Sequence, residues 1–171
     1  MAEQSAPADG PATLAEVKGH VLSSGVQRAS NLAYALRSEI QAIESSERPI
    51  RLKLFPRGSC GDASLILHSL INDAGIAGSR TAHATRVGAD GMSWPTHAWV
   101  ELSGVILDIT PDQFPDGGET IYVGPASPFY DSFVVDYYEI ATIKVMKGHG
   151  IPELHDFYDR LRIAVLGART L

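Results

Sequence analysis

The stretch HAWVELSGVILDIT, residues 97–110, contains two strand-like runs separated by Ser103-Gly104. A two-residue turn of this composition joins antiparallel strands into a hairpin and fixes which residues pair. We therefore expect a register in which Trp99 lies directly opposite Asp108. Because side chains alternate between the two faces of a strand, this register separates polar from apolar residues on the hairpin.

One face of the predicted hairpin is wholly apolar, and we expect it to be the buried face. It carries Ala98, Val100, Leu102, Val105, Leu107 and Ile109. The other face carries His97, Trp99 and Asp108 and is predicted to be exposed. His97 and Asp108 are diagonal neighbours there, with Cα atoms about 7–8 Å apart, so their side chains are within reach of each other.

The only cysteine, Cys60, stands at the start of a predicted helix that ends near Gly75. Unpaired amides and the helix dipole favour an anion at that position and lower the pKa of a thiol. Gly58 and Gly61 leave room for a substrate carbonyl, and the amides near Ser59 and Cys60 are candidate donors to its oxygen. The alternative is a packing role, since free cysteine is among the most buried residue types.

A catalytic cysteine needs a base, which is usually a histidine oriented by a third group. His68 lies about 12 Å from Cys60 along the same predicted helix, which is too far to reach the thiol. The remaining histidines lack an acidic or cysteine partner at a suitable spacing: His20, His83, His149 and His155. His97, with Asp108 on the same face, is therefore the candidate base. Neither a zinc-ligand spacing nor a phosphate-binding loop is present, so no metal and no cofactor are predicted.

The remaining pattern predicts helices first and strands afterwards, which indicates an α+β fold with a mostly antiparallel sheet. Helices are expected over 13–25, with Thr13 as N-cap, over 26–48, over the Cys60 segment and over 151–167. Further strands are expected over 50–55, 79–87, 120–124, 133–140 and 141–147. The predicted apolar face of the second helix comprises Leu32, Leu36, Ile40 and Ile43, and that of the Cys60 helix comprises Ala63, Leu67, Leu70, Ile71 and Ala74.

The composition is that of a single globular domain: 171 residues, 44% hydrophobic and 20% charged, with a net charge of −6. The negative charge argues against nucleic acid or an anionic membrane as a partner. Residues 1–12 are rich in Ala, Pro and Ser and are expected to be a disordered tail. They do not resemble a signal peptide, and one cysteine cannot form an internal disulfide, so a cytoplasmic location is expected. The composition does not predict an oligomeric state.

The segments GSCGDASLILHSLINDAG (58–75), HAWVEL (97–102) and LDIT (107–110) together resemble the transglutaminase-like superfamily of papain-like cysteine enzymes. The resemblance spans about 55–111 and implies a small bacterial-type catalytic domain over 13–171, with the Cys helix packed on the sheet. It implies Cys60 as nucleophile, His97 as base and Asp108 as orienting acid. The implied reaction is acyl transfer from a peptide or protein amide through a thioester, of peptidase or deamidase type.

Four further residues are candidates for contact with substrate: Arg57, Trp94, Trp99 and Gln113. Gln113 is a candidate donor to an oxyanion or to a substrate amide, and the alternative is that it caps a turn between two prolines. Two other functions stay open at this point. The chain could be an inactive transglutaminase-like module that binds a peptide or protein, or a toxin or effector that deamidates a target protein.

Overall fold

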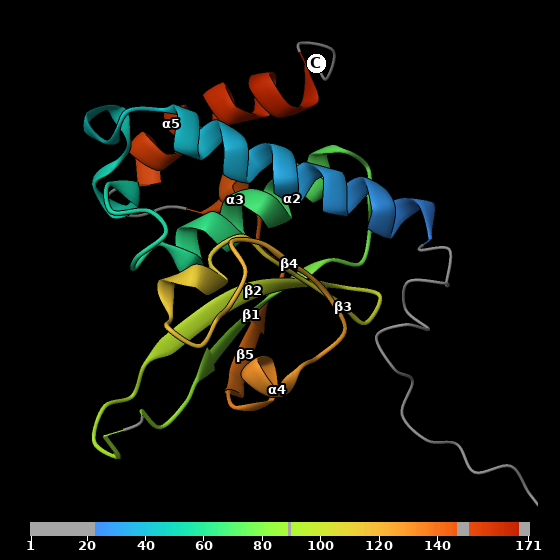
Figure 1. Ribbon diagram of the computed structural model, residues 1–171. Coiled ribbons are helices and arrows are strands. Elements are labelled where there is room, and N and C mark those ends of the chain that lie inside the picture. Colours follow the sequence, from blue (N-terminus) through green and yellow to red (C-terminus); the bar gives the residue numbers. More distant parts are fainter. Residues whose placement is uncertain (1–22, 89, 147–150, 168–171) are drawn as a thin grey trace, which may run out of the picture.

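The computed structural model describes residues 23–88, 90–146 and 151–167, in which helices lie on a five-stranded sheet (Figure 1). The α+β class is therefore confirmed. The tail over 1–12 and residues 13–22 of the first predicted helix fall outside the described residues. The predicted boundary between the first two helices was wrong, because Ser24 and Gly25 belong to the second one. The longer helices are α2 (Ser24–Ala42), α3 (Cys60–Asp73) and α5 (Ile151–Leu166). The strands are β1 (Arg80–Thr85), β2 (Thr96–Leu102), β3 (Val105–Asp108), β4 (Tyr122–Gly124) and β5 (Val134–Glu139). None of the helices in these ranges combines the length and apolar character needed to cross a membrane.

The strands lie in the order β4-β3-β2-β1-β5, and every neighbouring pair is antiparallel. The predicted hairpin register between β2 and β3 is confirmed, since Val100 pairs with Leu107 and Leu102 with Val105. Its turn places Ser103 at φ 51° and Gly104 at φ 78°. Positive φ at both central residues is the turn geometry that matches the twist of a tight hairpin.

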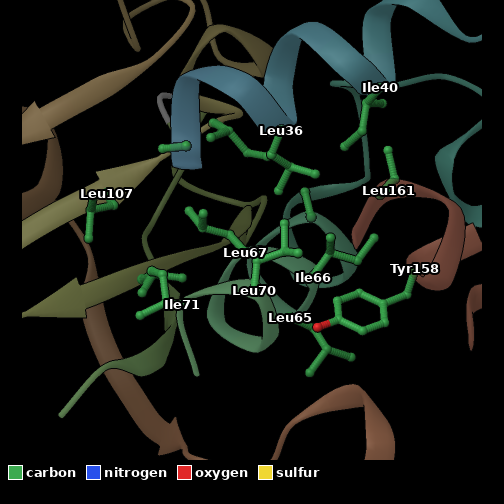
Figure 2. Packing of buried hydrophobic residues seen from close by; sticks show 14 of the residues in the cluster. Leu36, Ile40, Leu65, Ile66, Leu67, Leu70, Ile71, Leu107, Tyr158 and Leu161 are labelled. Carbon is green, nitrogen blue, oxygen red and sulfur yellow. The ribbon is translucent and has the colours of Figure 1, made fainter. Parts of the chain in front are cut away.

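One face of the sheet is covered by α2 and α3, and α5 packs on these two helices, so that their apolar side chains form one core with those of the hairpin (Figure 2). The predicted apolar face of the hairpin is buried here through Val100, Leu107 and Ile109, among others. Helix α3 lies at the centre, and every residue from Asp62 to Ile71 is buried, including those outside its predicted apolar face. Its first residue, Cys60, is thereby held at a fixed place against the sheet.

The opposite face of the hairpin is also buried, so the prediction that it is exposed was wrong. Trp99 and His97 are each 2% exposed, and Asp108 is 0% exposed. They are covered by the aromatic cluster, which we define as Trp99, Phe114, Phe129, Tyr130 and Phe133. Most of these rings come from the short helix α4 (Pro128–Asp131) and its flanking loops, which have no periodic pattern in the sequence.

Two segments predicted as strands contain short 3-10 helices instead, and residue 147 of the second lies outside the described residues. In 50–55, the 3-10 helix covers Ile50–Leu52, and successive turns satisfy the backbone, as in the bond of 3.1 Å from Phe55 N to Leu52 O. In 141–147, the 3-10 helix covers Ile143–Val145, and the Ile143 amide donates to Ser69 Oγ of α3 at 2.9 Å. A segment whose backbone groups are paired in this way needs no neighbouring strand. Helix α2 also ends earlier than expected, at Ala42, and another 3-10 helix (Ser45–Glu47) follows it.

Leu52 and Leu54 in the segment 50–55 allow a test of whether this segment is a 3-10 helix with turns or a strand. Leu52 is 0% exposed and Leu54 is 76% exposed, although a strand would place both on one face. We expect Leu52→Ala to lower the free energy of unfolding by about 2–5 kcal/mol, because it leaves a cavity in the core. We expect Leu54→Ala to change it by less than about 0.5 kcal/mol. Urea denaturation followed by circular dichroism measures both, and equal losses would contradict the described conformation.

Candidate active site

Asp108 ends β3 with a fully buried carboxylate that is surrounded by hydrogen-bond donors. Its Oδ1 accepts from the Thr110 amide at 2.8 Å and from Thr110 Oγ1 at 3.1 Å. Its Oδ2 accepts from His97 Nε2 at 2.6 Å and from the Tyr130 hydroxyl at 3.0 Å. One oxygen therefore caps the end of the strand while the other holds the histidine ring.

His97 is fixed in position by Asp108 and by the aromatic cluster around its ring. The ring centroid lies 5.0 Å from that of Phe114, 5.6 Å from that of Trp99 and 5.7 Å from that of Phe133. Burial disfavours the imidazolium, but the charge and hydrogen bond of Asp108, followed by those of Cys60, outweigh it and raise the pKa of His97 to about 9. Because Nε2 faces the carboxylate, Nδ1 is the nitrogen left for proton exchange with a reacting group.

Cys60 occupies the first position of α3, where its thiol is half-buried. Burial disfavours the thiolate, but a hydrogen bond and charge attraction from His97 outweigh that penalty. Weaker hydrogen bonds from Gln113 and from the Ala98 backbone add to them, and the net effect lowers the pKa of Cys60. The free amides at a helix N-terminus act in the same direction. The pair therefore favours the thiolate–imidazolium form.

Gln113 contacts both His97 and the loop before Cys60. It lies in the short 3-10 helix Pro111–Gln113 that follows β3. Its Nε2 lies 3.1 Å from His97 Nδ1 and donates to the Thr110 carbonyl at 3.1 Å. Its Oε1 accepts from the amide of Gly58 at 3.3 Å. Gln113 therefore caps the turn through the Thr110 carbonyl and also contacts the site through His97. The Gly58 amide and the Thr110 carbonyl together fix the orientation of its side-chain amide.

A cavity of about 280 Å³ opens beside the thiol. Its lining comprises Cys60, Gly61, His83, Ala84, Thr96, His97, Ala98, Asp136 and Tyr137. A Cβ built on Gly61 would meet no atom within 4 Å, so the space beside the thiol at this position is open. A substrate that entered this cavity would lie next to both Cys60 and His97.

The other candidates from the sequence lie at varying distances from this cavity. Ser59 occupies the N-cap position but is buried, and its hydroxyl oxygen lies 3.2 Å from each of two acceptors, the carbonyls of Arg51 and Arg57. Trp99 supports the His97 ring from within the aromatic cluster and does not line the cavity. Arg57 and Trp94 are exposed and do not line it either.

Sequence reasoning missed Tyr130 and the acidic, aromatic wall of the cavity formed by Asp136 and Tyr137. Tyr130 lies on α4, a four-residue helix, and its only sequence signal is that it belongs to an aromatic pair, Phe129-Tyr130. Of the other histidines, His68 has a structural role, since its Nδ1 lies 2.9 Å from Ser79 Oγ. His83 lies 3.3 Å from a carboxylate oxygen of Glu139, a partner that is far away in the sequence.

Comparison of the chain with protein-family models, with curated proteins and with solved structures found no match.

We expect the hydrogen bond from the Tyr130 hydroxyl to Asp108 to lower the pKa of His97. Tyr130→Phe removes one donor from the carboxylate, which concentrates its negative charge toward His97, so we expect the pKa of His97 to rise. We expect the free energy of unfolding to fall by about 1–2 kcal/mol. NMR titration of His97 and urea denaturation measure the two effects.

Tyr122→Phe is the matched control, because the Tyr122 hydroxyl donates to the Pro125 carbonyl at 2.6 Å and not to Asp108. It should cost stability without moving the pKa of His97. If both variants left that pKa unchanged, Tyr130 would have a purely structural role.

Proposed function

We propose that the chain is a cysteine hydrolase or acyltransferase that acts on peptide or protein amides. The observation that carries the proposal is the relay from Asp108 to His97 to Cys60. It combines a 2.6 Å bond between Asp108 Oδ2 and His97 Nε2 with a lowered pKa of the Cys60 thiol. The resemblance of the motifs to transglutaminase-like enzymes supports the same assignment and a papain-like arrangement of the helix and sheet. The half-buried thiol at an open cavity favours an active enzyme over an inactive binding module.

In the ion pair, the proton of the Cys60 thiol has already been transferred to His97 Nδ1. In the first step, the thiolate attacks the carbonyl carbon of the amide. Asp108 stabilises the imidazolium through Nε2–H, as a buried carboxylate does for a catalytic histidine. When the tetrahedral intermediate collapses, the C–N bond breaks and Nδ1–H protonates the departing amine. The product of this step is a thioester on Cys60.

Gln113 is coupled to the same proton transfer. While Nδ1 is unprotonated, it accepts the Gln113 N–H that faces it at 3.1 Å. Once Nδ1 carries the proton, it becomes a donor, and this N–H loses its acceptor. The amide is then free to donate to the nearby thiolate and to the oxygen of the tetrahedral intermediate. The free amides in the first turn of α3 supply the other donors to this oxyanion.

In the second step, water or an amine attacks the thioester and gives a proton to His97 Nδ1. The C–S bond breaks, and the Cys60 thiolate leaves next to the imidazolium. Water yields a carboxylic acid, and an amine yields a new amide. Both outcomes use the same three residues, and the acyl acceptor decides between hydrolysis and transfer.

The lowered pKa of Cys60 makes a direct prediction about its reactivity. An ordinary thiol is only about 0.3% ionised at pH 6, whereas the ion pair with His97 keeps the native thiolate populated. We expect iodoacetamide to alkylate native Cys60 at pH 6 at least about tenfold faster than it alkylates the urea-unfolded chain. Because the chain has one cysteine, the intact mass reports this reaction without ambiguity.

His97→Ala should reduce the rate at pH 6 to that of the unfolded chain or below, and Cys60→Ala should show no adduct. Raising the pH through about 9 discharges His97 but keeps the thiolate, so alkylation should persist there. A native thiol that reacts more slowly than the unfolded one at pH 6 would contradict the proposed nucleophile.

Gln113→Leu distinguishes a role of Gln113 in stabilising the oxyanion from a role in activating the Cys60 thiol. It removes the amide donor but keeps Cys60, His97 and Asp108, so we expect alkylation at pH 7 to change by only a few-fold. Acylation by p-nitrophenyl acetate, which passes through an oxyanion, should fall by about 100-fold. The release of p-nitrophenol in the first turnover measures this rate. A parallel loss in both reactions would instead mean that Gln113 acts on the thiol alone.

A further inference from the structure

Part of the wall of the cavity beside Cys60 carries a negative charge and an aromatic ring. Asp136 and Tyr137 form this part of the lining, and both come from β5, the edge strand. The Tyr137 side chain is 57% exposed, and its ring stacks on that of His83 with centroids 4.5 Å apart. The lining residues include no Lys or Arg.

A β-bulge brings Asp136 into this wall. Tyr137 pairs with His83 and Val135 pairs with Ala84, so Asp136 is the extra residue without a partner on β1. Neighbouring residues in a regular strand point to opposite faces. Here Asp136 contacts Thr85 and Tyr137 stacks on His83, and Thr85 and His83 share one face of β1, so both side chains lie on that face. A bulge redirects a side chain in this way, and such bulges are frequent beside active sites.

The carboxylate of Asp136 is held in place without being neutralised. Its Oδ2 accepts from Thr85 Oγ1 at 2.7 Å, and within the described ranges no Lys or Arg pairs with it. The adjacent His83 already has an acidic partner, because it lies 3.3 Å from Glu139. A fixed carboxylate next to an aromatic ring attracts an ammonium or guanidinium group.

We propose that Asp136 and Tyr137 select a substrate that carries a cationic group close to the carbonyl attacked by Cys60. This inference rests on the proposed function and names the class of substrate. Lysine-like chains meet the requirement in two ways: as a basic residue of the acyl donor, or as a diamine that accepts the acyl group. In the first case the ammonium group lies against Asp136 while the carbonyl carbon faces the sulfur of Cys60. In the second case it lies there while the other amine nitrogen faces the thioester on Cys60.

The single cysteine allows the charge of the cavity to be measured at the sulfur itself. Two methanethiosulfonate reagents, one with a trimethylammonium group and one with a sulfonate, form a disulfide with Cys60 and release methanesulfinate. The ratio of their rate constants reports the local potential. In Asp136→Asn, we expect the cation-to-anion ratio to fall by about tenfold at low salt and by less at 0.5 M salt.

Asp131→Asn is the matched control, because it removes the same charge from an exposed residue on α4 that does not line the cavity. It should leave the ratio within about twofold of that of the unmodified chain. An equal ratio in Asp136→Asn and in the control would overturn the inference, even if the neutral methyl reagent still reacted rapidly with Cys60. Slow reaction with all three reagents would overturn the proposed nucleophile instead.

Two substrate pairs distinguish the sources of the cation. For the acyl donor, the p-nitrophenyl esters of N-acetyl-lysine and N-acetyl-norleucine are compared. For the acyl acceptor, 1,5-diaminopentane and pentylamine compete with water for the acetyl-enzyme. A preference for the charged member of one pair that falls at least about fivefold in Asp136→Asn supports the inference and identifies the source. Unchanged preferences in both pairs would overturn it.

Discussion

The buried carboxylate of Asp108 is the constraint on which the site depends. A buried carboxylate is stable only when hydrogen-bond donors pair with both of its oxygens. Asp108 meets this requirement with donors from three places: His97 on β2, Thr110 just after β3, and Tyr130 on α4. The aromatic cluster excludes water from the same region. The cluster and the short helix that carries Tyr130 hold His97 and Asp108 in place, whereas the charge and hydrogen bond of Asp108 raise the pKa of His97 against the penalty of burial.

A second buried charge connects the helices to this region. The Arg37 guanidinium of α2 donates to the Ile109 carbonyl at 2.6 Å and to both carboxylate oxygens of Asp112, at 2.9 and 2.7 Å. Asp112 immediately precedes Gln113 in the same 3-10 helix. The position of Gln113 next to His97 is thus fixed from the helical side of the sheet. Two ionic contacts hold the segment that carries Asp108 and Gln113: the buried pair of His97 with Asp108 and the partly buried pair of Arg37 with Asp112.

The sequence was sufficient to predict the hairpin register, the helix beginning at Cys60 and the proximity of His97 to Asp108. Each rests on a local rule: turn composition, side-chain alternation or helix periodicity. The prediction of an exposed polar face failed because rings from Phe114, Phe129 and Phe133 cover it, and nothing local links them to β2. Asp136 was missed for a similar reason. The bulge that positions it depends on how β5 pairs with β1, and the sequence of β5 alone does not reveal that pairing. The short alternating runs at 50–55 and 141–147 looked like strands because they contain too few residues to distinguish a strand from a short 3-10 helix.

The nucleophile and the base belong to different layers of the protein, and the start of β2 is where the layers meet. Cys60 comes from the helical layer, whereas His97 lies under the aromatic cluster on the other face. The next residue, Ala98, faces α3, and its carbonyl accepts from Ser64 Oγ at 3.0 Å. Ser64 lies one helical turn after Cys60, so this bond ties the first turns of α3 to the strand directly beside the base. The small side chain of Ala98 permits this close approach, and a bulky residue there would separate the helix from the strand. The spacing between sulfur and imidazole is therefore set by packing between the layers, and the chemistry of Cys60 depends on the fold of both.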